Sequence, residues 1–412
     1  MADFRTAGKN IIKNHWALIA VLLIIVLSMH IRLLDYRWPY LRNIDSYMFL
    51  REMDEIVQNN GVYPAYDIYV RAPEGEERTA PGAVPQIYPY QHLGAYSFMF
   101  FRAFFPNLQL WQYLIYLPAF LAALMAIPAY LVGRLLYDKR AGVLAAFFTV
   151  FDISIVSRTL GGDPDSDALQ LLVPLIVMGV FLYTYKYIDT KKVLDKRAIF
   201  YSILTGISLG VWANTWIGYW YIVWIMLGAL ILKIVIETAI KRKPAFKENA
   251  HLILSYAIFL SVFLFLFILP VFGMGRVIYT FTGPIEFQDI KGEGGRQFPN
   301  VGVSVAELQG SGGLREIIQR ASAIDFSQNP IALLFSPFVI MIYTMIYLGY
   351  SFVKTKKHFD AFLVLFIWFV GPILATVVAV RFSILFSQPI AIGLGIFFSK
   401  ISRMTFGERL DE

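Results

Sequence analysis

Three aspartates lie within five positions of the chain, in the segment Gly161-Gly-Asp-Pro-Asp-Ser-Asp167. Carboxylates this close repel one another unless a cation neutralises them, and a set of oxygen ligands favours Mg²⁺ or Mn²⁺ over zinc or copper. A divalent cation held by an Asp-x-Asp pair could stabilise charge on a departing phosphate oxygen. The competing interpretation is a solvated loop in which Asp163 caps the helix that follows.

Other charged residues occur singly. Asp45 follows the first apolar segment, Arg158 directly precedes the acidic segment, and Glu307 lies in a glycine-rich stretch. A single carboxylate says little about function by itself. These residues gain meaning only if the fold brings them to the acidic segment.

The composition indicates a membrane protein. Hydrophobic residues make up 58% of the 412 residues and charged residues 16%, and the mean hydropathy is +0.59. These values exclude disorder, collagen, a coiled coil and an ordinary cytosolic enzyme, and they predict an all-α polytopic membrane protein. The chain has no cysteine, which excludes disulfides, thiolate metal sites and a cysteine nucleophile. We expect no nucleic-acid partner, because a net charge of +7 more often reflects basic cytoplasmic loops.

About ten segments are apolar enough to cross a membrane, which takes roughly 20 residues. Lys9 and Lys13 precede the first segment and no small-residue cleavage site follows it. We therefore expect an uncleaved anchor instead of a signal peptide. The predicted spans are 16–34, 111–133, 141–157, 168–187, 198–213, 215–236, 250–272, 331–353, 360–379 and 382–399.

Lys and Arg residues fall in alternate loops between these spans. If the N-terminus is cytoplasmic, every basic loop lies on the cytoplasmic side, as the positive-inside rule requires. The sequence therefore predicts a multi-pass protein of the cell membrane whose acidic residues lie on the extracytoplasmic face. The basic loops hold Arg134, Lys139 and Arg140; Lys191, Lys192, Lys196 and Arg197; Lys241, Arg242, Lys243 and Lys247; Lys354, Lys356 and Lys357; and Lys400, Arg403 and Arg409.

Two long segments then lie on the outer face of a single membrane domain, 1–412. Segment 35–110 is too polar to span, but amphipathic stretches such as Tyr47–Val57 are typical of helices in the membrane interface. Segment 273–330 is rich in glycine, which leaves the backbone largely unconstrained, so we expect a flexible outer loop. Loops of this length are usually functional or disordered.

Two further features suggest a substrate at the membrane surface. The aromatic turn Asn214–Trp220 could contact a lipid-linked substrate, or it could simply lie in the membrane interface. Arg381 lies between two apolar runs, where an ionisable residue usually has a partner. It could bind a lipid phosphate or a peptide carboxylate, or it could anchor a helix end by snorkelling.

In this order, these residues resemble the catalytic subunit of oligosaccharyltransferase in its archaeal form, a member of the C-type glycosyltransferase superfamily. The resemblance spans nearly the whole chain. It implies a C-type glycosyltransferase-like fold with about ten or more transmembrane helices and two long outer loops. The matching features are Asp45 in the first outer loop, Ser157-Arg-Thr159 followed by Asp165-Ser-Asp167, Ser304-Val-Ala-Glu307, and Val380-Arg-Phe382.

The resemblance implies transfer of a glycan from a polyprenyl (pyro)phosphate carrier to Asn in an Asn-x-Ser/Thr sequon. The expected partners are the lipid-linked oligosaccharide donor, an acceptor polypeptide with a sequon, and membrane lipids. By the same resemblance, Asp45, Asp165, Asp167 and Glu307 share one Mn²⁺ or Mg²⁺. Asp45 and Glu307 also accept hydrogen bonds from the acceptor amide.

The resemblance further implies roles for the cationic and aromatic residues. Arg158 and Arg381 stabilise the phosphate leaving group, and Tyr219 touches it. Asp163 is interpreted as a residue outside the metal's ligand set or as a helix cap. The glycine-rich loop closes over the acceptor and delivers Glu307.

One departure from the family is large. The family carries a soluble outer domain with a Trp-Trp-Asp-Tyr-Gly motif that reads the sequon hydroxyl, and the 412 residues contain no such pentapeptide. Three interpretations stay open: a truncated form, a separate sequon-reading subunit, or a short relative with another acceptor. The chain contains no Asn-x-Ser/Thr sequon of its own.

Two other classes of function remain as alternatives. A different C-type glycosyltransferase would add one sugar from a polyprenyl-phosphate donor to another acceptor. A transporter or a non-catalytic membrane subunit is the other alternative. Transporters usually place charges near the bilayer midplane and often have inverted repeats, whereas here the acidic residues occupy outer positions.

Overall fold

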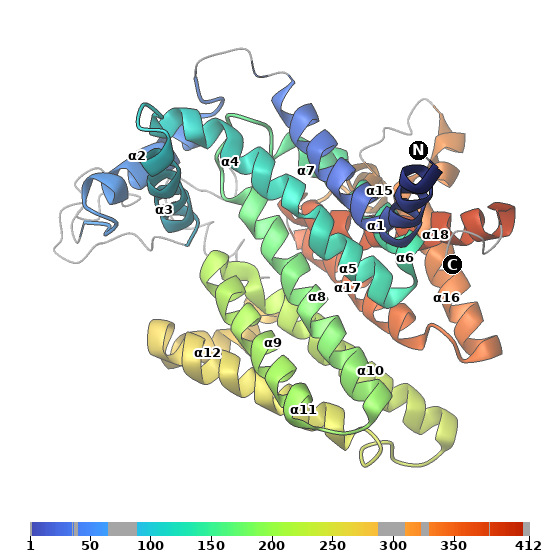
Figure 1. The fold of residues 1–412 in the computed structure, drawn as a ribbon. Helices are drawn as coiled ribbons and strands as arrows, with labels where there is room; N and C mark the ends of the chain where they lie inside the picture. The colour runs from blue at the N-terminus through green and yellow to red at the C-terminus, as the bar shows by residue number, and fades with distance from the viewer. Residues whose placement is uncertain are drawn as a thin grey trace.

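Helices are the expected elements, because a segment inside a bilayer must satisfy every backbone N–H and C=O group within itself. The computed structural model is a bundle of helices, and the described part of the chain contains no strand (Figure 1). It describes residues 2–34, 36, 40–64, 89–286, 310–322, 329–378 and 380–406.

The first half of the chain ends with a long helix, α8, that begins directly after the acidic segment. Its elements are α1 (Ala2–Leu33), α2 (Ile44–Gln58), α3 (Pro89–Phe104), α4 (Leu110–Leu124), α5 (Ala126–Leu136), α6 (Lys139–Val150), α7 (Ile153–Ser157) and α8 (Asp167–Lys191).

The second half adds further long helices and several short turns. Its elements are α9 (Lys196–Thr215), η2 (Ile217–Tyr219), α10 (Trp220–Lys241), α11 (Ala250–Val262), the π-helical η3 (Phe263–Ile268), α12 (Leu269–Glu286), α15 (Leu314–Ser322), η6 (Pro330–Phe335), α16 (Pro337–Thr355), α17 (Phe359–Val378), η7 (Val380–Phe386) and α18 (Ser387–Phe406).

Nine helical stretches among the described residues are long and apolar enough to cross a membrane. They match nine of the ten predicted spans, including the division between α9 and α10. The tenth, 141–157, is not a single helix. It consists of α6 and α7, separated at Asp152, whose carboxylate accepts hydrogen bonds from the backbone N–H groups of Ser154 and Ile155.

The two outer segments also differ in part from expectation. Segment 35–110 contains helices α2 and α3, as its amphipathic pattern predicts. The second segment begins later than predicted, because α11, η3 and α12 form one helical stretch that continues to Glu286. Gly273 interrupts its regular geometry with φ = +78°. Residues 287–309 lie outside the described part of the chain.

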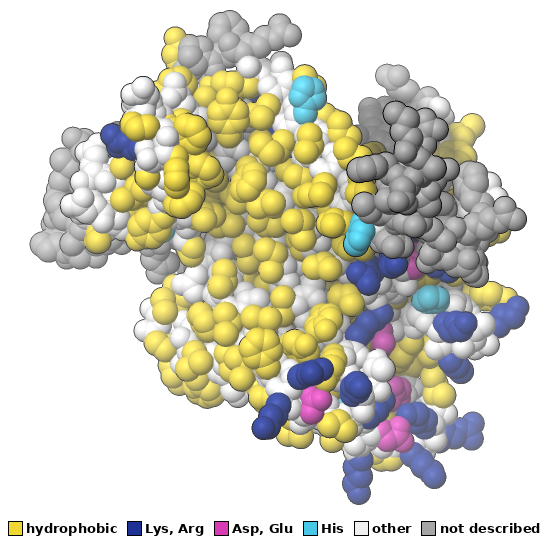
Figure 2. Space-filling view, viewed as in Figure 1, with side chains coloured by type: hydrophobic (Ala, Val, Ile, Leu, Met, Phe, Trp, Pro, Cys, Tyr) yellow, Lys and Arg dark blue, Asp and Glu magenta, His cyan; other side chains and the backbone are white. Residues whose placement is uncertain are grey.

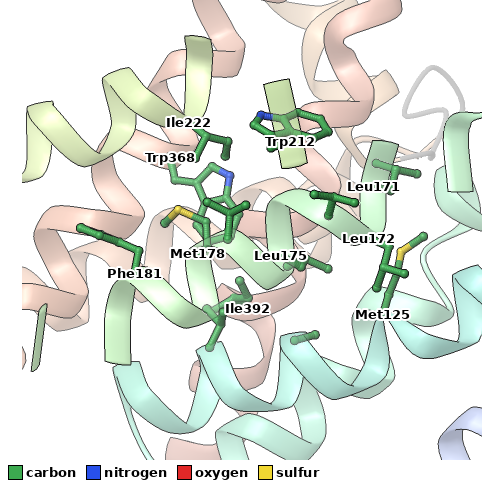
Figure 3. Close-up of a cluster of buried hydrophobic side chains, with 14 of the residues drawn as sticks. Met125, Leu171, Leu172, Leu175, Met178, Phe181, Trp212, Ile222, Trp368 and Ile392 are labelled. Carbon is green, nitrogen blue, oxygen red and sulfur yellow. The ribbon is translucent and has the colours of Figure 1, made fainter. Parts of the chain in front are cut away.

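Helix α8 lies at the centre of the bundle. In its apolar window 78% of the residues are buried within the protein, against 28% for α1. Figure 3 shows Leu171, Leu175 and Met178 of α8 packed among Trp212 of α9 and Trp368 of α17. Because α8 is enclosed by neighbouring helices, it holds the acidic segment at its N-terminus in a fixed position.

The predicted basic loops lie at the opposite end of the bundle from the acidic segment. Asp138, between α5 and α6, forms an ion pair with Arg403 of α18 at 2.9 Å. Lys233 of α10 lies 3.4 Å from Asp189 of α8 and 3.3 Å from Asp360 of α17. In Figure 2 the Lys and Arg side chains gather around this end, while hydrophobic side chains cover most of the remaining visible surface.

Candidate functional site

The acidic segment is held to the helices beneath it by its own backbone. Gly161 N–H donates to the Arg32 carbonyl at the end of α1 (3.0 Å), and Gly162 N–H donates to the Ile115 carbonyl of α4 (3.0 Å). The fully buried Arg32 side chain donates to Thr159 Oγ1 at 2.9 Å. Gly162 has φ = +81°, a conformation that glycine adopts without strain. These contacts fix the loop that carries the aspartates.

Arg42 and Ser46, two residues of the first outer segment, form hydrogen bonds with the acidic segment. Arg42 donates from its backbone N–H to the Gly162 carbonyl (2.7 Å) and from Nε to the Gly161 carbonyl (2.8 Å). Ser46 Oγ donates to Asp163 Oδ1 at 3.0 Å and is fully buried. Asp45 lies next to Ser46 in the first turn of α2, and its side chain is exposed. The fold therefore brings Asp45 to the edge of the acidic segment.

The predicted arginine makes a direct contact with the acidic segment. Arg158 forms an ion pair with Asp167 Oδ2 at 3.1 Å, and both side chains are largely shielded from solvent. Asp165 Oδ1 accepts hydrogen bonds from the backbone N–H and the hydroxyl of Ser166. Arg158, Asp165 and Asp167 thus form one compact group at the start of α8.

Burial and the charges of neighbouring carboxylates make Asp163 and Asp165 costly to ionise. Burial, together with the neighbouring charges of Asp167 and Asp163, raises the pKa of Asp165 to about 6, against the effect of its hydrogen bonds from Ser166. Burial also raises the pKa of Asp163, although the hydrogen bond from Ser46 opposes the shift. A bound cation would remove this penalty, because it favours the ionised carboxylates.

A cavity opens beside this group, with about 430 Å³ of empty space, part of it open to solvent. Arg158, Asp167 and Gln170 form its polar wall. Its apolar wall comes from α8, α9 and η7 and consists of Leu171, Trp212, Trp216, Phe382, Ile384 and Leu385. A pocket with a cation and a carboxylate on one side and aromatic rings on the other suits an amphipathic, anionic ligand.

The outcome differs among the three remaining predicted site residues, Arg381, Glu307 and Tyr219. Arg381 lies in η7 directly before Phe382, which lines the cavity, but its own side chain lies outside the described part of the structure. Glu307 also lies outside the described residues. Tyr219 is fully buried, and its hydroxyl bonds Thr280 Oγ1 (2.9 Å) and the Arg276 carbonyl (3.1 Å). In this structure Tyr219 therefore faces α12 and not the cavity.

The interpretation of Asp163 as a helix cap is wrong. The residue at the cap position of α8 is Ser166, whose own side chain makes no capping hydrogen bond. Asp163 instead accepts the hydrogen bond from Ser46 on α2. Its role is to join two segments that are far apart in the sequence.

Of the four predicted metal ligands the structure describes three, Asp45, Asp165 and Asp167; their oxygen donors suit a divalent cation but are not gathered into one set. Among the described residues, no three carboxylate or histidine side chains lie close enough together to hold a metal ion. Asp165 and Asp167 offer oxygen ligands of the kind that Mg²⁺ and Mn²⁺ prefer. The raised pKa of Asp165 is what a cation at this position would offset.

Sequence reasoning missed several residues of the site. Trp212 lies one helical turn before Trp216, with their rings 5.7 Å apart, so helical spacing was an available signal. Gln170 follows Asp167 by three residues on α8, which is also a helical neighbour. Arg32 and Ser46 carried no comparable signal, because their partners lie 127 and 117 residues away.

Sequence comparison identifies archaeal relatives. The chain is 28% identical over 181 residues to a dolichyl-phosphooligosaccharide-protein glycotransferase of Methanocaldococcus jannaschii, covering 42% of this chain and 18% of the relative. It is 25% identical over 209 residues to dolichyl-phosphooligosaccharide-protein glycotransferase 3 of Archaeoglobus fulgidus, covering 48% and 23%. The alignments thus span less than a quarter of either relative.

The fold is similar to that of solved oligosaccharyltransferases from Archaeoglobus fulgidus. A complex of AglB with an inhibitory peptide and a dolichol-phosphate superposes with a TM-score of 0.63 at 19% identity, covering 97% of this chain and 52% of that one. A complex with Zn and sulfate gives 0.66 at 20% identity, covering 95% and 50%. This chain therefore spans about half the length of those proteins.

The most extensive match is to a family model. The model described as "Oligosaccharyl transferase STT3, N-terminal" matches residues 16–408, which include the acidic segment, the cavity and every described membrane span except the first residue of α1's apolar stretch. The chain therefore belongs to the oligosaccharyl transferase STT3 family.

Proposed function

We propose that this chain is the membrane-embedded catalytic part of an oligosaccharyltransferase. It would transfer an oligosaccharide from a polyprenyl (pyro)phosphate carrier to the Asn of an Asn-x-Ser/Thr sequon. The observation that carries this proposal is the Arg158–Asp167 pair, which lies beside Asp165 and opens into a cavity with aromatic walls. Solved oligosaccharyltransferases of similar fold include a complex with an inhibitory peptide and a dolichol-phosphate and one tethered to an acceptor peptide with an NVT sequon.

The donor would enter with its phosphate toward the polar wall of the cavity. A guanidinium group offers N–H donors in a planar fork that matches phosphate oxygens, so Arg158 is suited to hold the leaving phosphate. Arg381, next to Phe382 of the cavity wall, would supply a second cation. Trp212 and Trp216 would then lie against the first apolar units of the carrier.

Asp165 and Asp167, together with Asp45 and Glu307, would hold Mn²⁺ or Mg²⁺. The oxygen-only donor set and the raised pKa of Asp165 support this assignment. When bound, such a cation supplies charge stabilisation for the leaving phosphate. Before it binds, Arg158 offsets part of the negative charge through its ion pair with Asp167.

The acceptor amide needs help from the protein, because its nitrogen lone pair is delocalised into the carbonyl. Asp45 is exposed at the start of α2 and close to the acidic segment, so an extended peptide could reach it. A carboxylate there would accept an N–H hydrogen bond from the acceptor side chain and orient it. Glu307 would make the second such contact.

We also propose that the N-terminus faces the cytoplasm and the site faces outward at the cell membrane. The basic loops gather at the end of the bundle opposite the acidic segment, which supports this orientation. A lipid-linked donor would then be used from the outer leaflet.

The decisive experiment is glycan transfer from a native lipid-linked oligosaccharide extract to a fluorescent Asn-x-Thr peptide. The purified chain is assayed with Mn²⁺, with Mg²⁺ and with EDTA, and a Gln-x-Thr peptide serves as the matched control. We expect a glycopeptide only with the Asn peptide and only with a divalent cation.

A second arm adds the soluble fraction of the source cells. Product that forms only after this addition would indicate a separate sequon-reading subunit. If neither arm yields glycopeptide while a full-length archaeal enzyme does, transfer to this acceptor is contradicted. Transfer of a single sugar from a polyprenyl-phosphate donor to a lipid acceptor would then be assayed in its place.

A further inference from the structure

Arg276 is a charged residue in an otherwise apolar stretch of α12. Its side chain is partly buried, and no carboxylate or other hydrogen-bond acceptor of the described residues contacts its guanidinium. The nitrogen atoms of its guanidinium are not among the buried atoms that lack a hydrogen-bond partner. An arginine has five N–H donors and no means of losing its charge, so these donors need an acceptor other than the described residues.

Three aromatic rings surround this guanidinium. Its central carbon lies 5.1 Å from the ring centre of Tyr279, 5.4 Å from Phe272 and 6.0 Å from Tyr219. Tyr219 is itself fixed by its hydrogen bond to Thr280. Cation–π contacts engage the charge through the ring faces, and they leave the N–H groups at the edge of the guanidinium free to bind an oxyanion.

The position of Arg276 along the helix places it at the level of the lipid headgroups. It follows Ala250, the first residue of this helical stretch, by 26 residues, which corresponds to a rise of roughly 39 Å. A tilt of about 20° reduces the rise to about 37 Å. The hydrocarbon layer is only about 30 Å thick, and Ala250 begins at the basic end of the bundle. Arg276 therefore lies in the opposite headgroup layer, where phosphate groups are abundant.

The surroundings of Arg276 leave room for such a group. Gly273 and Gly275 lie on the preceding turn, and a side-chain carbon added to either would meet no atom within 4 Å. Met274 and Ile278 are exposed on the same helix and face away from the bundle, as expected for lipid contacts. Figure 1 shows α12 along an outer edge of the bundle, and α12 packs against α10.

We propose that Arg276 is a binding site for the phosphate of an outer-leaflet lipid, with Tyr219, Phe272 and Tyr279 orienting its guanidinium. The phosphate could belong to a membrane phospholipid or to a polyprenyl phosphate, since both present the same oxyanion. This site is separate from the Arg158–Asp167 pair and does not depend on glycan transfer. A lipid held here would cover the junction between η2 and α12, next to the aromatic turn.

The test measures lipid binding to the purified full chain by native mass spectrometry. Dioleoyl phosphatidylglycerol is compared with dioleoyl glycerol, and a polyprenyl phosphate is compared with the matching polyprenol, so that each pair differs only in the phosphate-bearing headgroup. Inorganic phosphate is the third probe. We expect the phosphate-bearing lipids to bind about tenfold more tightly than their counterparts, as charge-assisted hydrogen bonds of this kind suggest.

Substitutions of Arg276 test whether this residue is responsible for the preference for phosphate-bearing lipids. Arg276→Gln should abolish the preference for phosphatidylglycerol and remove part of the preference for polyprenyl phosphate, because the cavity beside Arg158 still binds the carrier. Arg276→Lys, which keeps the charge but not the planar fork, should retain part of what Arg276→Gln loses. Arg102→Gln is the matched control, because Arg102 is exposed in the outer segment and lies over a single ring, that of Phe98, at 5.9 Å. A loss confined to polyprenyl phosphate would identify the carrier lipid as the ligand, a loss confined to phosphatidylglycerol would identify membrane phospholipid, and a loss for both would identify a site that accepts either lipid.

Two outcomes would overturn the proposal. One is an Arg276→Gln chain that keeps the wild-type preference for phosphate-bearing lipids. The other is a wild-type chain that binds each phosphate-bearing lipid no better than its phosphate-free counterpart. The second comparison uses only the wild-type chain, so it tests the proposed phosphate site even if Arg276→Gln fails to fold.

Discussion

Asp165 is the residue at which the proposed chemistry can be tested most directly. Its carboxylate is partly buried between Asp163 and Asp167, and its pKa is raised to about 6. Asp165→Asn keeps the size of the side chain but removes the negative charge that would hold a cation. We expect transfer to fall by about 100-fold or more, as for other losses of charge stabilisation in a transition state, when kcat/KM is measured with the sequon peptide.

The matched control for this change is Asp54→Asn. Asp54 lies on the same helix as Asp45, α2, and among the described residues its carboxylate contacts only Gln58 of that helix. This variant should transfer glycan at the wild-type rate. An Asp165→Asn chain as active as Asp54→Asn would remove Asp165 from the catalytic group.

Ser46 and Asp163 test whether the contact between α2 and the acidic loop positions Asp45. Ser46→Ala removes a buried hydrogen bond to a carboxylate, which should lower the free energy of unfolding by about 1–3 kcal/mol and reduce transfer. Asp163→Asn should be much milder, because its amide oxygen still accepts the hydrogen bond from Ser46. Thermal midpoints in detergent and transfer rates for both variants check this ranking, which equal losses would refute.

Site residues that are close together in the sequence could be predicted, whereas those whose partners are distant in the sequence could not. Asp165 and Asp167 are close in the sequence, so their spacing predicted a shared site, and the family resemblance added Arg158. The structure places Arg158 in an ion pair with Asp167, beside Asp165. Ser46 and Arg32 reach the same loop from more than 100 residues away. A single sequence carries no pattern for such contacts, because helix packing and not local spacing creates them.

At the level of the elements, Gly162 determines the shape of the acidic loop. Its φ of +81° disfavours any residue with a side chain, and an added Cβ would lie 2.6 Å from a ring carbon of Tyr36. Gly162→Ala should therefore destabilise the protein by about 1–3 kcal/mol and misplace the aspartates. Gly371→Ala is the control, because Gly371 lies in α17 with open space around it, and this change should leave the melting temperature unchanged or slightly higher.

The helices themselves followed from hydropathy wherever a segment is long and uniformly apolar. The prediction of one continuous helix failed over 141–157, where α6 ends at Val150 and Asp152 caps α7 although the flanking residues are apolar. The predicted span 250–272 was also too short, because α12 continues through Gly273 to Glu286. Hydropathy measures the tendency of a segment to enter a membrane, and it does not report where the backbone breaks or how far a helix extends beyond the bilayer.

Lys233 connects three helices of the bundle. Its buried ammonium lies within 4 Å of Asp189 on α8, Glu237 on α10 and Asp360 on α17. Lys233→Met leaves these carboxylates without their shared cation, and we expect a loss of about 3–5 kcal/mol of stability, as for a broken buried ion pair. Lys241→Met, which removes an exposed partner of Glu237, should have no measurable effect on the thermal midpoint. Similar midpoints for the two variants would contradict the connecting role of Lys233.

For the molecule as a whole, the distribution of charge determines how the bundle sits in a membrane. The loops after α5, α8, α10 and α16 are rich in Lys and Arg and lie at one end, whereas the acidic segment lies at the other end of the 25-residue helix α8. Because basic loops are retained in the cytoplasm, the end with the acidic segment should face outward. This arrangement can be tested without background labelling, since the chain has no cysteine.

Asn107→Cys places a thiol between α3 and α4, and Lys243→Cys places one between α10 and α11; both positions are exposed. In intact cells, a membrane-impermeant maleimide should label the cysteine at 107 and leave that at 243 unmodified until the membrane is permeabilised. The reverse pattern would put the acidic segment in the cytoplasm. A lipid-linked donor in the outer leaflet could not then reach the cavity, so this measurement bears on the proposed reaction as directly as the loss of Asp165 does.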